Sequence, residues 1–347
     1  MSRPTATWRP LARRRFAVAA AAAGLLLLAA CGDSPTNPTA HELTPTSGHT
    51  ATTTTSGPTT STTTGGPTTS TTSSTTSTTF AYGAPPWTVL SQDPAGVAVE
   101  EQKVTVPSGQ VATLVRFDAG RVVFDLHIGS QDPPVNLASI PADRGPAIAA
   151  DEAPFLLAAF NGGFKIHDGP GGVQQQGQVI APLSDGKASF VIDVDGTAHV
   201  GVWGSGLPRP GEPVASVRQN LAPLVTAGVT NPAVNNPSDW GATLTSSKLV
   251  PRSGAGEDAR GDIIFAGGMA LLPSDLSAAL VDAGAVNAMQ LDINPEWVQL
   301  DAAAAEGAPL ATQIPGQVRP YNQYVSGWTR DFFVVMGPIV NPRLRPR

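Results

Sequence analysis

Cysteine and histidine are both scarce in this sequence, and their scarcity excludes several kinds of chemistry. Cys31 is the only cysteine among 347 residues, so the remainder has no disulfide, no thiolate metal ligand and no cysteine nucleophile. Beyond residue 80 the histidines are His127, His167 and His199, which are not spaced like a metal-binding motif. The chain also lacks a phosphate-binding loop, a dinucleotide-binding glycine pattern and a Gly-x-Ser-x-Gly nucleophile elbow.

Basic residues are outnumbered by acidic ones. The whole chain has 21 Lys and Arg against 27 Asp and Glu. Five arginines lie within residues 1–30, which we expect to be removed by cleavage before Cys31, so the remaining chain has 16 basic and 27 acidic residues and a net charge of −11. Because phosphate backbones are bound by basic surfaces, a nucleic-acid partner is not expected.

Residues 1–31 have the three parts of an export signal. A basic segment is followed by an apolar run over residues 16–30, which is shorter than the about 20 residues that a membrane-spanning helix needs. The run ends in Leu28-Ala29-Ala30-Cys31-Gly32, which resembles the lipobox of bacterial lipoproteins and implies that Cys31 is lipidated. Arg13-Arg14-Arg15-Phe16 resembles a twin-arginine signal, so the general secretory and twin-arginine routes both stay open. The simpler alternative is that Cys31 is only a small residue at the end of a hydrophobic run.

Threonine, serine, proline and glycine dominate residues 32–79. Such a composition cannot bury enough apolar surface to offset the entropy of ordering, so we expect a disordered linker. Together these segments predict an exported protein, anchored by a lipid to the outer face of the cell membrane, with its domain on a tether.

Runs rich in β-branched and aromatic residues dominate the chain from residue 80 onward. Turn residues separate them, and Asp195-Gly196 is a strong hairpin signal between two such runs. One helix is expected over residues 275–283, with Ser274 as its N-cap and Gly284 at its C-terminal end. Strands are expected over residues 96–106, 111–117, 121–128, 155–160, 188–194, 197–203, 288–292 and 332–336. The sequence therefore predicts a single strand-dominated α+β domain with few helices over residues 80–347.

Two glycine-containing clusters are candidates for anion binding. Asn161-Gly162-Gly163 directly follows an apolar strand, and its glycines would let backbone amides approach a ligand closely. Arg252 lies among small residues in an expected loop, where its guanidinium could bind a phosphate or carboxylate. Taken singly, an ordinary tight turn and a solvated arginine explain these clusters as well.

A third cluster combines carboxylates with an aromatic ring. Asp292, Asn294, Glu296 and Trp297 lie within six residues of one another, after an apolar segment. Burial would make the pKa of Asp292 sensitive to its neighbours, and the indole offers a flat face to a sugar. A structural aspartate that caps a turn is the simpler alternative. A fourth polar run, residues 218–221, is interpreted as an exposed helix start.

The order of these elements resembles the phosphodiester glycosidase domain family. The resemblance rests on residues 158–164, on Pro251-Arg252-Ser253-Gly254, on a helix over residues 272–284 and on the run from Ala288 to Asp292. It covers about residues 96–336. Where the family usually continues Leu-Asp with two glycines and a small hydroxyl residue, this chain has Ile293-Asn294-Pro295.

The resemblance implies a hydrolase that acts on the glycosidic bond of a sugar-1-phosphodiester or a related envelope glycan. Asp292 would act at the anomeric carbon or activate water. Arg252 and the amides of residues 161–163 would stabilise the phosphate charge. From their chemistry alone, Glu296 is the candidate second carboxylate, and Asn294 and Trp297 are candidate substrate-binding residues.

Two other functions remain open at this stage. The scaffold could serve as a non-catalytic lipoprotein that binds a glycan or envelope polymer, or as a purely structural surface protein. No cofactor and no metal motif is indicated, although the oxygens of Asp292, Asn294 and Glu296 would suit Ca²⁺ or Mg²⁺. The expected partners are a glycan or sugar phosphate and, through Cys31, the membrane.

Overall fold

The computed structural model describes residues 85–134, 144–241 and 247–337, all within the unit Ser77–Arg347. The predicted signal segment, Cys31 and the predicted linker lie outside the described residues. Within the described ranges, no helix has both the length and the apolar character needed to span a membrane.

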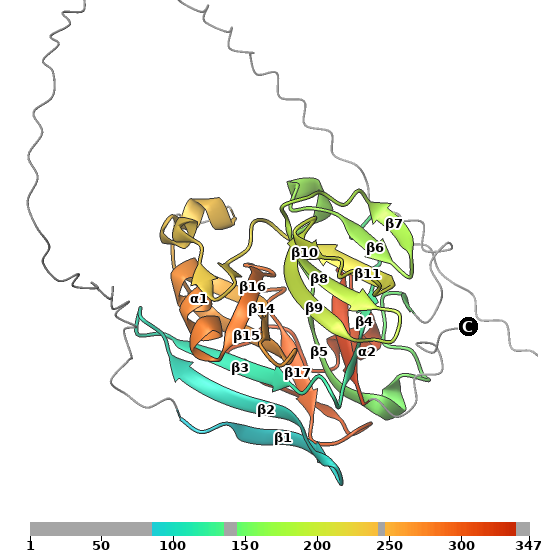
Figure 1. Cartoon of the computed structure of the whole chain (residues 1–347). Helices are drawn as coiled ribbons and strands as arrows, with labels where there is room; N and C mark the ends of the chain where they lie inside the picture. The colour runs from blue at the N-terminus through green and yellow to red at the C-terminus, as the bar shows by residue number, and fades with distance from the viewer. Residues whose placement is uncertain (1–84, 135–143, 242–246, 338–347) are drawn as a thin grey trace, which may run out of the picture. The chain divides into compact units, whose positions relative to one another are not determined.

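Three β-sheets form the domain (Figure 1). The eight-stranded sheet has the order β1-β2-β3-β15-β14-β16-β12-β13, with bounds Thr88–Asp93, Gly96–Thr105, Val111–Phe117, Ile263–Leu271, Val250–Asp258, Ala285–Gln290, Val225–Thr226 and Val229–Thr230. The six-stranded sheet is β10-β9-β8-β11-β6-β7, with bounds Gly206–Leu207, Ala198–Trp203, Ala188–Asp193, Val214–Gln219, Val173–Gln175 and Gln178–Ala181. The five-stranded sheet is β18-β17-β5-β19-β4, with bounds Leu310–Thr312, Leu300–Ala303, Leu156–Asn161, Phe332–Met336 and Val123–His127.

Alternation along the strands places two separate apolar layers on the eight-stranded sheet. In β15, Ile263 and Phe265 belong to the large central core, whereas Ile264 and Ala266 pack in the core beneath the helix α1. Successive side chains of a strand point to opposite faces, so one strand supplies both layers. Strands buried on both faces are continuously apolar, which explains why β15 and β5 show no polar alternation.

The helix α1, Pro273–Asp282, covers the eight-stranded sheet and contacts β15, β16 and β14 (Figure 1). Its N-cap is Leu272 rather than the predicted Ser274. The carboxylate of Asp275 accepts hydrogen bonds from the amides of Leu272, at 2.9 Å, and Ser108, at 3.0 Å, and so satisfies the helix start in place of a serine. Gly284 follows the helix with a φ of 103°, as its predicted role requires. The remaining helices are the short α2, Gln323–Ser326, and 3-10 turns at Ala153–Phe155, Ile166–Asp168, Pro232–Asn235 and Pro237–Trp240.

The three sheets meet in a core of aromatic rings. Phe160 of β5 lies 5.2 Å from Phe333, 5.3 Å from Phe265 and 6.2 Å from Phe190, measured between ring centroids. These four rings come from all three sheets, and each is completely buried. The core therefore fixes the relative positions of the sheets, and with them the loops at the strand ends.

The predicted dominance of strands is confirmed. The fraction of residues in helices is smaller than the predicted α+β class implies, so the described fold is mostly β. Besides the N-cap, two further local predictions were wrong. The expected loop around Arg252 is the strand β14, because small residues there allow close packing against α1. The expected exposed helix start at residues 218–221 is the buried end of β11, with Arg218 fully buried.

Truncating the central ring should destabilise the domain strongly. We expect Phe160→Ala to lower the free energy of unfolding by about 3–5 kcal/mol, because the cavity is enclosed by three sheets that cannot all collapse into it. Denaturant unfolding measures this change. The matched control is Val229→Ala, at a side chain that is 70% exposed, with an expected change of about 0.5 kcal/mol or less. Equal effects of the two substitutions would contradict this account of the core.

Candidate functional site

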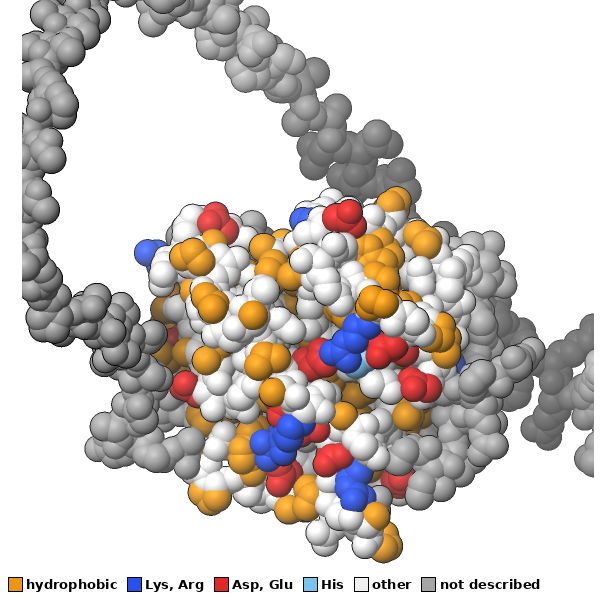
Figure 2. Space-filling model, viewed as in Figure 1, with side chains coloured by type: hydrophobic (Ala, Val, Ile, Leu, Met, Phe, Trp, Pro, Cys, Tyr) orange, Lys and Arg blue, Asp and Glu red, His pale blue; other side chains and the backbone are white. Residues whose placement is uncertain are grey.

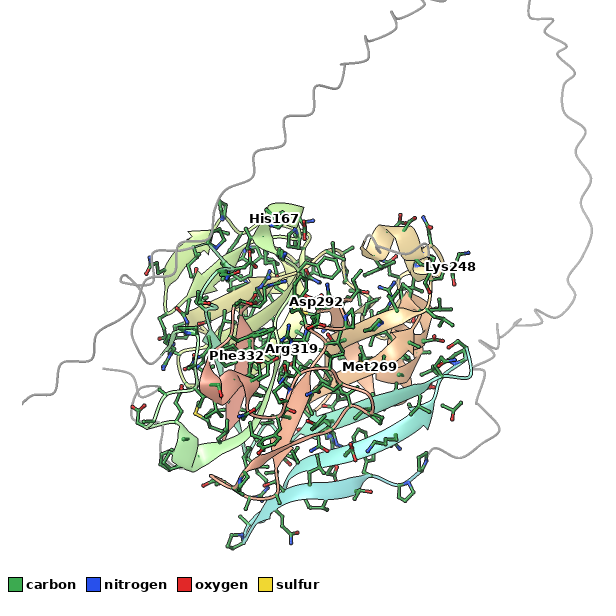
Figure 3. The ribbon with its side chains drawn as sticks, turned by 180° about the vertical axis from the view of Figure 1, so that it is seen from behind. His167, Lys248, Met269, Asp292, Arg319 and Phe332 are labelled. Carbon is green, nitrogen blue, oxygen red and sulfur yellow. The ribbon has the colours of Figure 1, made fainter. Side chains whose placement is uncertain are left out.

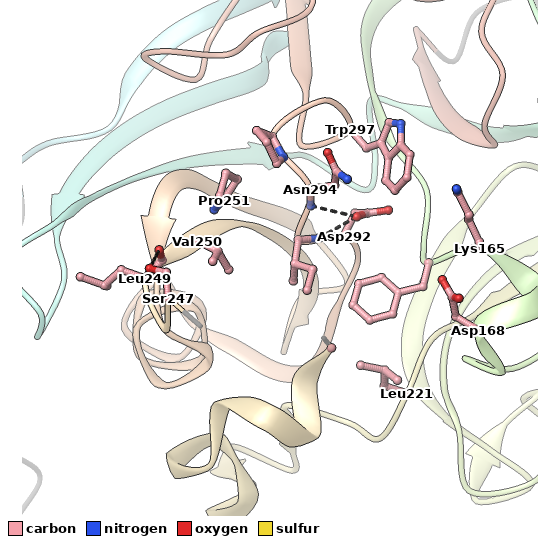
Figure 4. Close-up of a pocket in the computed structure, with 14 residues that line it drawn as sticks. Lys165, Asp168, Leu221, Ser247, Leu249, Val250, Pro251, Asp292, Asn294 and Trp297 are labelled. Carbon is pink, nitrogen blue, oxygen red and sulfur yellow. Dashed lines mark hydrogen bonds between the residues drawn. The ribbon is translucent and has the colours of Figure 1, made fainter. Parts of the chain in front are cut away.

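A cavity of about 740 Å³ opens beside Asp292 (Figure 4). The segment after β5 and the segment after β16 form facing walls, and the start of β14 closes a third side. Figure 3 shows Asp292 near the middle of the domain, with His167 at its edge. The lining includes Phe164, Lys165, Asp168, Asp292, Ile293, Asn294 and Trp297. Most of the lining is apolar, and Lys165, Asp168 and Asp292 are its charged members among the described residues.

Asp292 is the buried acidic group of this cavity, with 3% of its surface exposed. Its Oδ1 accepts hydrogen bonds from the amides of Ile293, at 2.7 Å, and Asn294, at 3.1 Å. Its Oδ2 lies 3.5 Å from Nη2 of Arg330. Burial raises the pKa of Asp292 to about 7, although Arg330 and the two amides act in the opposite direction. The carboxyl group can therefore gain or lose a proton near neutral pH.

Arg330 stands between Asp292 and the ring of Trp297. Its Nη2 donates a hydrogen bond of 2.6 Å to the carbonyl of Gly163, and its guanidinium carbon lies 4.3 Å from the indole centroid. Nζ of Lys165 lies 4.8 Å from the same ring. Two cations thus contact one indole, which fixes the position of the ring in the cavity wall.

Asn161 and Asp292 are brought together by the hydroxyl of Ser253. Nδ2 of Asn161 donates to Oγ of Ser253 at 2.9 Å, and the amide of Asp292 donates to the same oxygen at 3.2 Å. Oδ1 of Asn161 also accepts a hydrogen bond from the amide of Gln299 at 3.1 Å. Asn161 is buried and does not line the cavity, so its position indicates a role in joining the strand ends beneath Asp292.

Gly162 and Gly163 allow a buried ion pair to approach the backbone. Nε of Arg218 donates to Oδ2 of Asp331 at 2.7 Å, and both side chains are fully buried. A Cβ atom on Gly162 would lie 2.0 Å from the Asp331 carboxylate, and one on Gly163 would lie 3.0 Å from the Arg218 guanidinium. The amide of Gly162 donates to the Asp331 carbonyl at 3.0 Å. These glycines therefore serve the packing of the ion pair, and their amides face Asp331.

Arg252 lies away from the cavity. Its Nε donates to the carbonyl of Leu271 at 3.0 Å, and its Nη1 donates to the carbonyl of Trp240 and to Oε1 of Gln290. The side chain is completely buried, and burial lowers the pKa of Arg252 to about 10. Ser253 and Arg252 are neighbours on a strand and so face opposite sides, which places the serine, and not the arginine, at Asp292.

Glu296 also points elsewhere. Its Oε2 pairs with Nη2 of Arg319 at 2.5 Å, the side chain is 45% exposed, and the residue does not line the cavity. Oδ1 of Asn294 accepts a hydrogen bond from the amide of Glu296 at 2.9 Å and so stabilises the turn. Asp292, Asn294 and Glu296 therefore do not converge as ligands of one cation. Asn294 and Trp297 do line the cavity, as does Asp292.

Several residues of this site were not singled out from the sequence. Lys165 directly follows the predicted run over residues 161–164, and Arg330 and Asp331 directly precede the last strand. Polar residues beside a strand are a signal for a site, and Arg330 and Asp331 carry this signal. Leu221, from the polar run over residues 218–221, also lines the cavity and has a φ of 55°.

Comparisons with known proteins give a distant likeness in fold. No family model matches the chain, and no curated protein matches it in sequence. The zebrafish N-acetylglucosamine-1-phosphodiester alpha-N-acetylglucosaminidase catalytic domain, auto-inhibited by its pro-peptide, is 14% identical over 72% of this chain and 87% of that chain, with a TM-score of 0.42. A hypothetical protein from Synechocystis is 14% identical over 74% of this chain and 64% of that one, with a TM-score of 0.42. A Burkholderia pseudomallei protein whose name describes it as exported is 10% identical over 70% and 75%, with a TM-score of 0.34.

The raised pKa of Asp292 should be measurable as a dependence of stability on pH. The folded state holds this proton up to about pH 7, and the unfolded state releases it near the ordinary value of 3.8. The folded state therefore loses stability, relative to an uncharged side chain, as pH rises from about 4 to 7, by up to about 4 kcal/mol.

Asp292→Asn removes this titration, so its unfolding free energy should rise relative to the unsubstituted protein across the same interval and then level off. Denaturant unfolding at several pH values between 4 and 8 measures the difference, in which the other titrating groups cancel. A difference that does not change with pH would show that Asp292 ionises as freely in the folded protein as in the unfolded chain.

Proposed function

We propose that this protein is a hydrolase that cleaves the glycosidic bond of a sugar-1-phosphodiester or a related envelope glycan. The observation that carries the proposal is Asp292, a buried carboxyl group with a pKa of about 7 beside a cavity of about 740 Å³. A group that exchanges its proton near neutral pH, next to space for a ligand, suits acid–base or nucleophilic chemistry. The sequence elements that resemble the phosphodiester glycosidase domain family support the same reaction.

The cavity wall suits a sugar that carries negative charge. Trp297 supplies a flat apolar face, and aromatic rings of this kind pack against the C–H faces of sugars. Lys165 lies at the same ring and also lines the cavity, so a phosphate attached to the sugar can meet a cation there. Asp292 in its protonated form adds no repulsion when an anionic substrate enters.

Each group can be given a role in the reaction. When the glycosidic bond of a sugar-1-phosphodiester breaks, the leaving group is a phosphomonoester, which is a stable anion. The reaction therefore depends more on charge stabilisation than on protonation of the leaving oxygen. Lys165 provides that stabilisation, because Arg252 is occupied by Leu271, Trp240 and Gln290. Asp292, once ionised, takes a proton from the water that displaces the phosphomonoester at the anomeric carbon. Alternatively, it attacks this carbon itself and forms a glycosyl ester that water then hydrolyses. Arg330, 3.5 Å from Oδ2, stabilises the ionised form.

One observation favours a second function, non-catalytic binding of a glycan or envelope polymer. Glycosidases usually place two carboxyl groups across the bond that is cleaved. Here Glu296 pairs with Arg319, and the other carboxylate of the cavity wall, Asp168, is exposed. A cavity lined by one buried carboxyl group can bind a sugar phosphate through Lys165 and Trp297 without turning it over.

Substitution of Asp292 separates these functions. We expect the unsubstituted protein to release free sugar from glucose-, N-acetylglucosamine- or mannose-1-phosphodiesters. Its kcat/KM should rise as pH rises through about 7, because the ionised form of Asp292 is the reactive one. Asp292→Asn should lower kcat by about 10²–10⁴-fold and remove this pH dependence. Glu296→Gln is the matched control and should leave kcat nearly unchanged.

Full activity in the Asp292→Asn protein would remove this residue from the mechanism. Saturable binding of the same compounds, measured by calorimetry in the absence of any turnover, would identify the protein as a glycan-binding module.

We also propose that the protein is exported and anchored through a lipid on Cys31. The proposal rests on the basic segment, the short apolar run and the position of Cys31 in residues 1–31. Cells that produce the protein and are fed a labelled fatty acid should incorporate the label into it, and Cys31→Ser should abolish that incorporation. Equal labelling of both proteins would place the lipid elsewhere or exclude this anchor.

A further inference from the structure

A second group of titratable side chains lies away from the cavity. Asp193 ends β8, His199 lies in β9, and Glu212 lies in the loop between β10 and β11. Nε2 of His199 is 3.5 Å from Oδ2 of Asp193 and 3.6 Å from Oε2 of Glu212. Among the described residues, these form the one set of three His, Cys, Asp or Glu side chains whose ligand atoms all lie within 4.8 Å of one another. Charged side chains of both signs and a histidine meet on the face shown in Figure 2.

The spacing of these three atoms fits a metal ion. Zinc binds imidazole nitrogen and carboxylate oxygen at about 2.0–2.2 Å, so two donors in a tetrahedral site are separated by roughly 3.4 Å. The two distances from His199 Nε2, 3.5 Å and 3.6 Å, are close to this separation. An ion could therefore bind with small movements of the side chains.

Asp193 gives an independent reason to expect a cation. The residue is 5% exposed, and its carboxylate accepts no hydrogen bond from the described residues, although its backbone is paired within the hairpin. Its Oδ2 points toward His199 Nε2. Burial raises the pKa of Asp193. Among the described residues, the positive groups beside Asp193 are His199 and Arg209, and a dication between Asp193 and His199 would compensate the carboxylate more fully.

Glu257 holds the imidazole in the orientation that a metal requires. Its Oε1 lies 3.0 Å from Nδ1 of His199, and its Oε2 accepts a hydrogen bond of 2.9 Å from the amide of Val200. With Nδ1 donating to Glu257, Nε2 is left with its lone pair toward Asp193 and Glu212. A carboxylate behind a metal-binding histidine commonly fixes its tautomer in this way.

Arg209 occupies the same region as a competing cation. Its Nη2 donates to Glu257 at 2.7 Å, and its Nη1 lies 3.3 Å from Nε2 of His199. Its side chain is 41% exposed and can swing outward. We propose that Asp193, His199 and Glu212 bind a divalent transition metal, zinc above all, which displaces Arg209. The donor set of one imidazole and two carboxylates favours zinc over calcium or magnesium.

The site would join parts of the six-stranded sheet that no covalent cross-link connects. Asp193 and His199 belong to the β8–β9 hairpin, and Glu212 belongs to the loop that leads into β11. Cys31 is the only cysteine, so this domain has no disulfide to close the loop. A bound ion would restrict the loop and stabilise the folded state in proportion to its occupancy.

The test is a titration of the full chain, purified in detergent and freed of metal with a chelator, with ZnCl₂ in a calorimeter. We expect one saturable site and a rise of several degrees in Tm on zinc addition. Magnesium and calcium chloride should give neither. Glu212→Gln, at a side chain that is 42% exposed and so tolerant of change, should weaken zinc binding at least tenfold.

Two further variants test the geometry, and one serves as a control. Glu257→Gln should weaken binding by about 10–100-fold through the orientation of His199. Arg209→Gln should tighten it by about tenfold, because a repelling cation is removed. His167→Ala, at a histidine with a 71% exposed side chain, should change nothing.

No saturable binding of zinc would overturn the proposal. So would binding that Glu212→Gln and His199→Ala both leave unchanged, because the ion would then lie elsewhere in the chain. None of these measurements uses a glycan substrate, so their outcome is independent of the reaction proposed for Asp292.

Discussion

The candidate site depends on one hydroxyl group. Oγ of Ser253 accepts hydrogen bonds from the side chain of Asn161 and from the amide of Asp292, and so joins the ends of β5, β14 and β16. β14 and β16 are paired in one sheet and β5 belongs to another, so the hydroxyl links the two sheets at this point. Because the amide of Asp292 is held there, its carboxylate is directed toward Arg330 and the cavity.

Several charges are buried beneath the cavity, and each is placed against a partner. Arg218 pairs with Asp331, and Arg330 lies beside Asp292. Burying a charge is costly unless it is compensated, so such a group of residues is retained in a core for specificity or for chemistry. The negative charge of Asp292 has the more distant partner, because Arg330 approaches only to 3.5 Å whereas Arg218 lies 2.7 Å from Asp331. Burial is therefore the dominant effect on Asp292 and raises its pKa.

The sequence predicted the strands well where apolar runs end at glycine and proline. Asp292 was a candidate site residue because it closes such a run, and it does line the cavity. It could not predict which side chains face one another. Arg252 and Ser253 differ by one position, and only the pairing of β14 with β16 shows that the serine meets Asp292. Arg330 lies 38 residues from Asp292, and its contact depends on the pairing of β19 with β5, which no local pattern encodes.

Gly162 packs so closely against Asp331 that this position cannot accept a larger residue, whereas the turn after Asp292 can be substituted more easily. Any side chain at Gly162 would displace a buried ion pair, whichever ligand the cavity holds. The turn at residues 293–296 has no comparable restriction, since Glu296 reaches solvent. Gly162 is therefore constrained by packing within the fold itself, whereas Glu296 can be replaced without displacing a buried side chain.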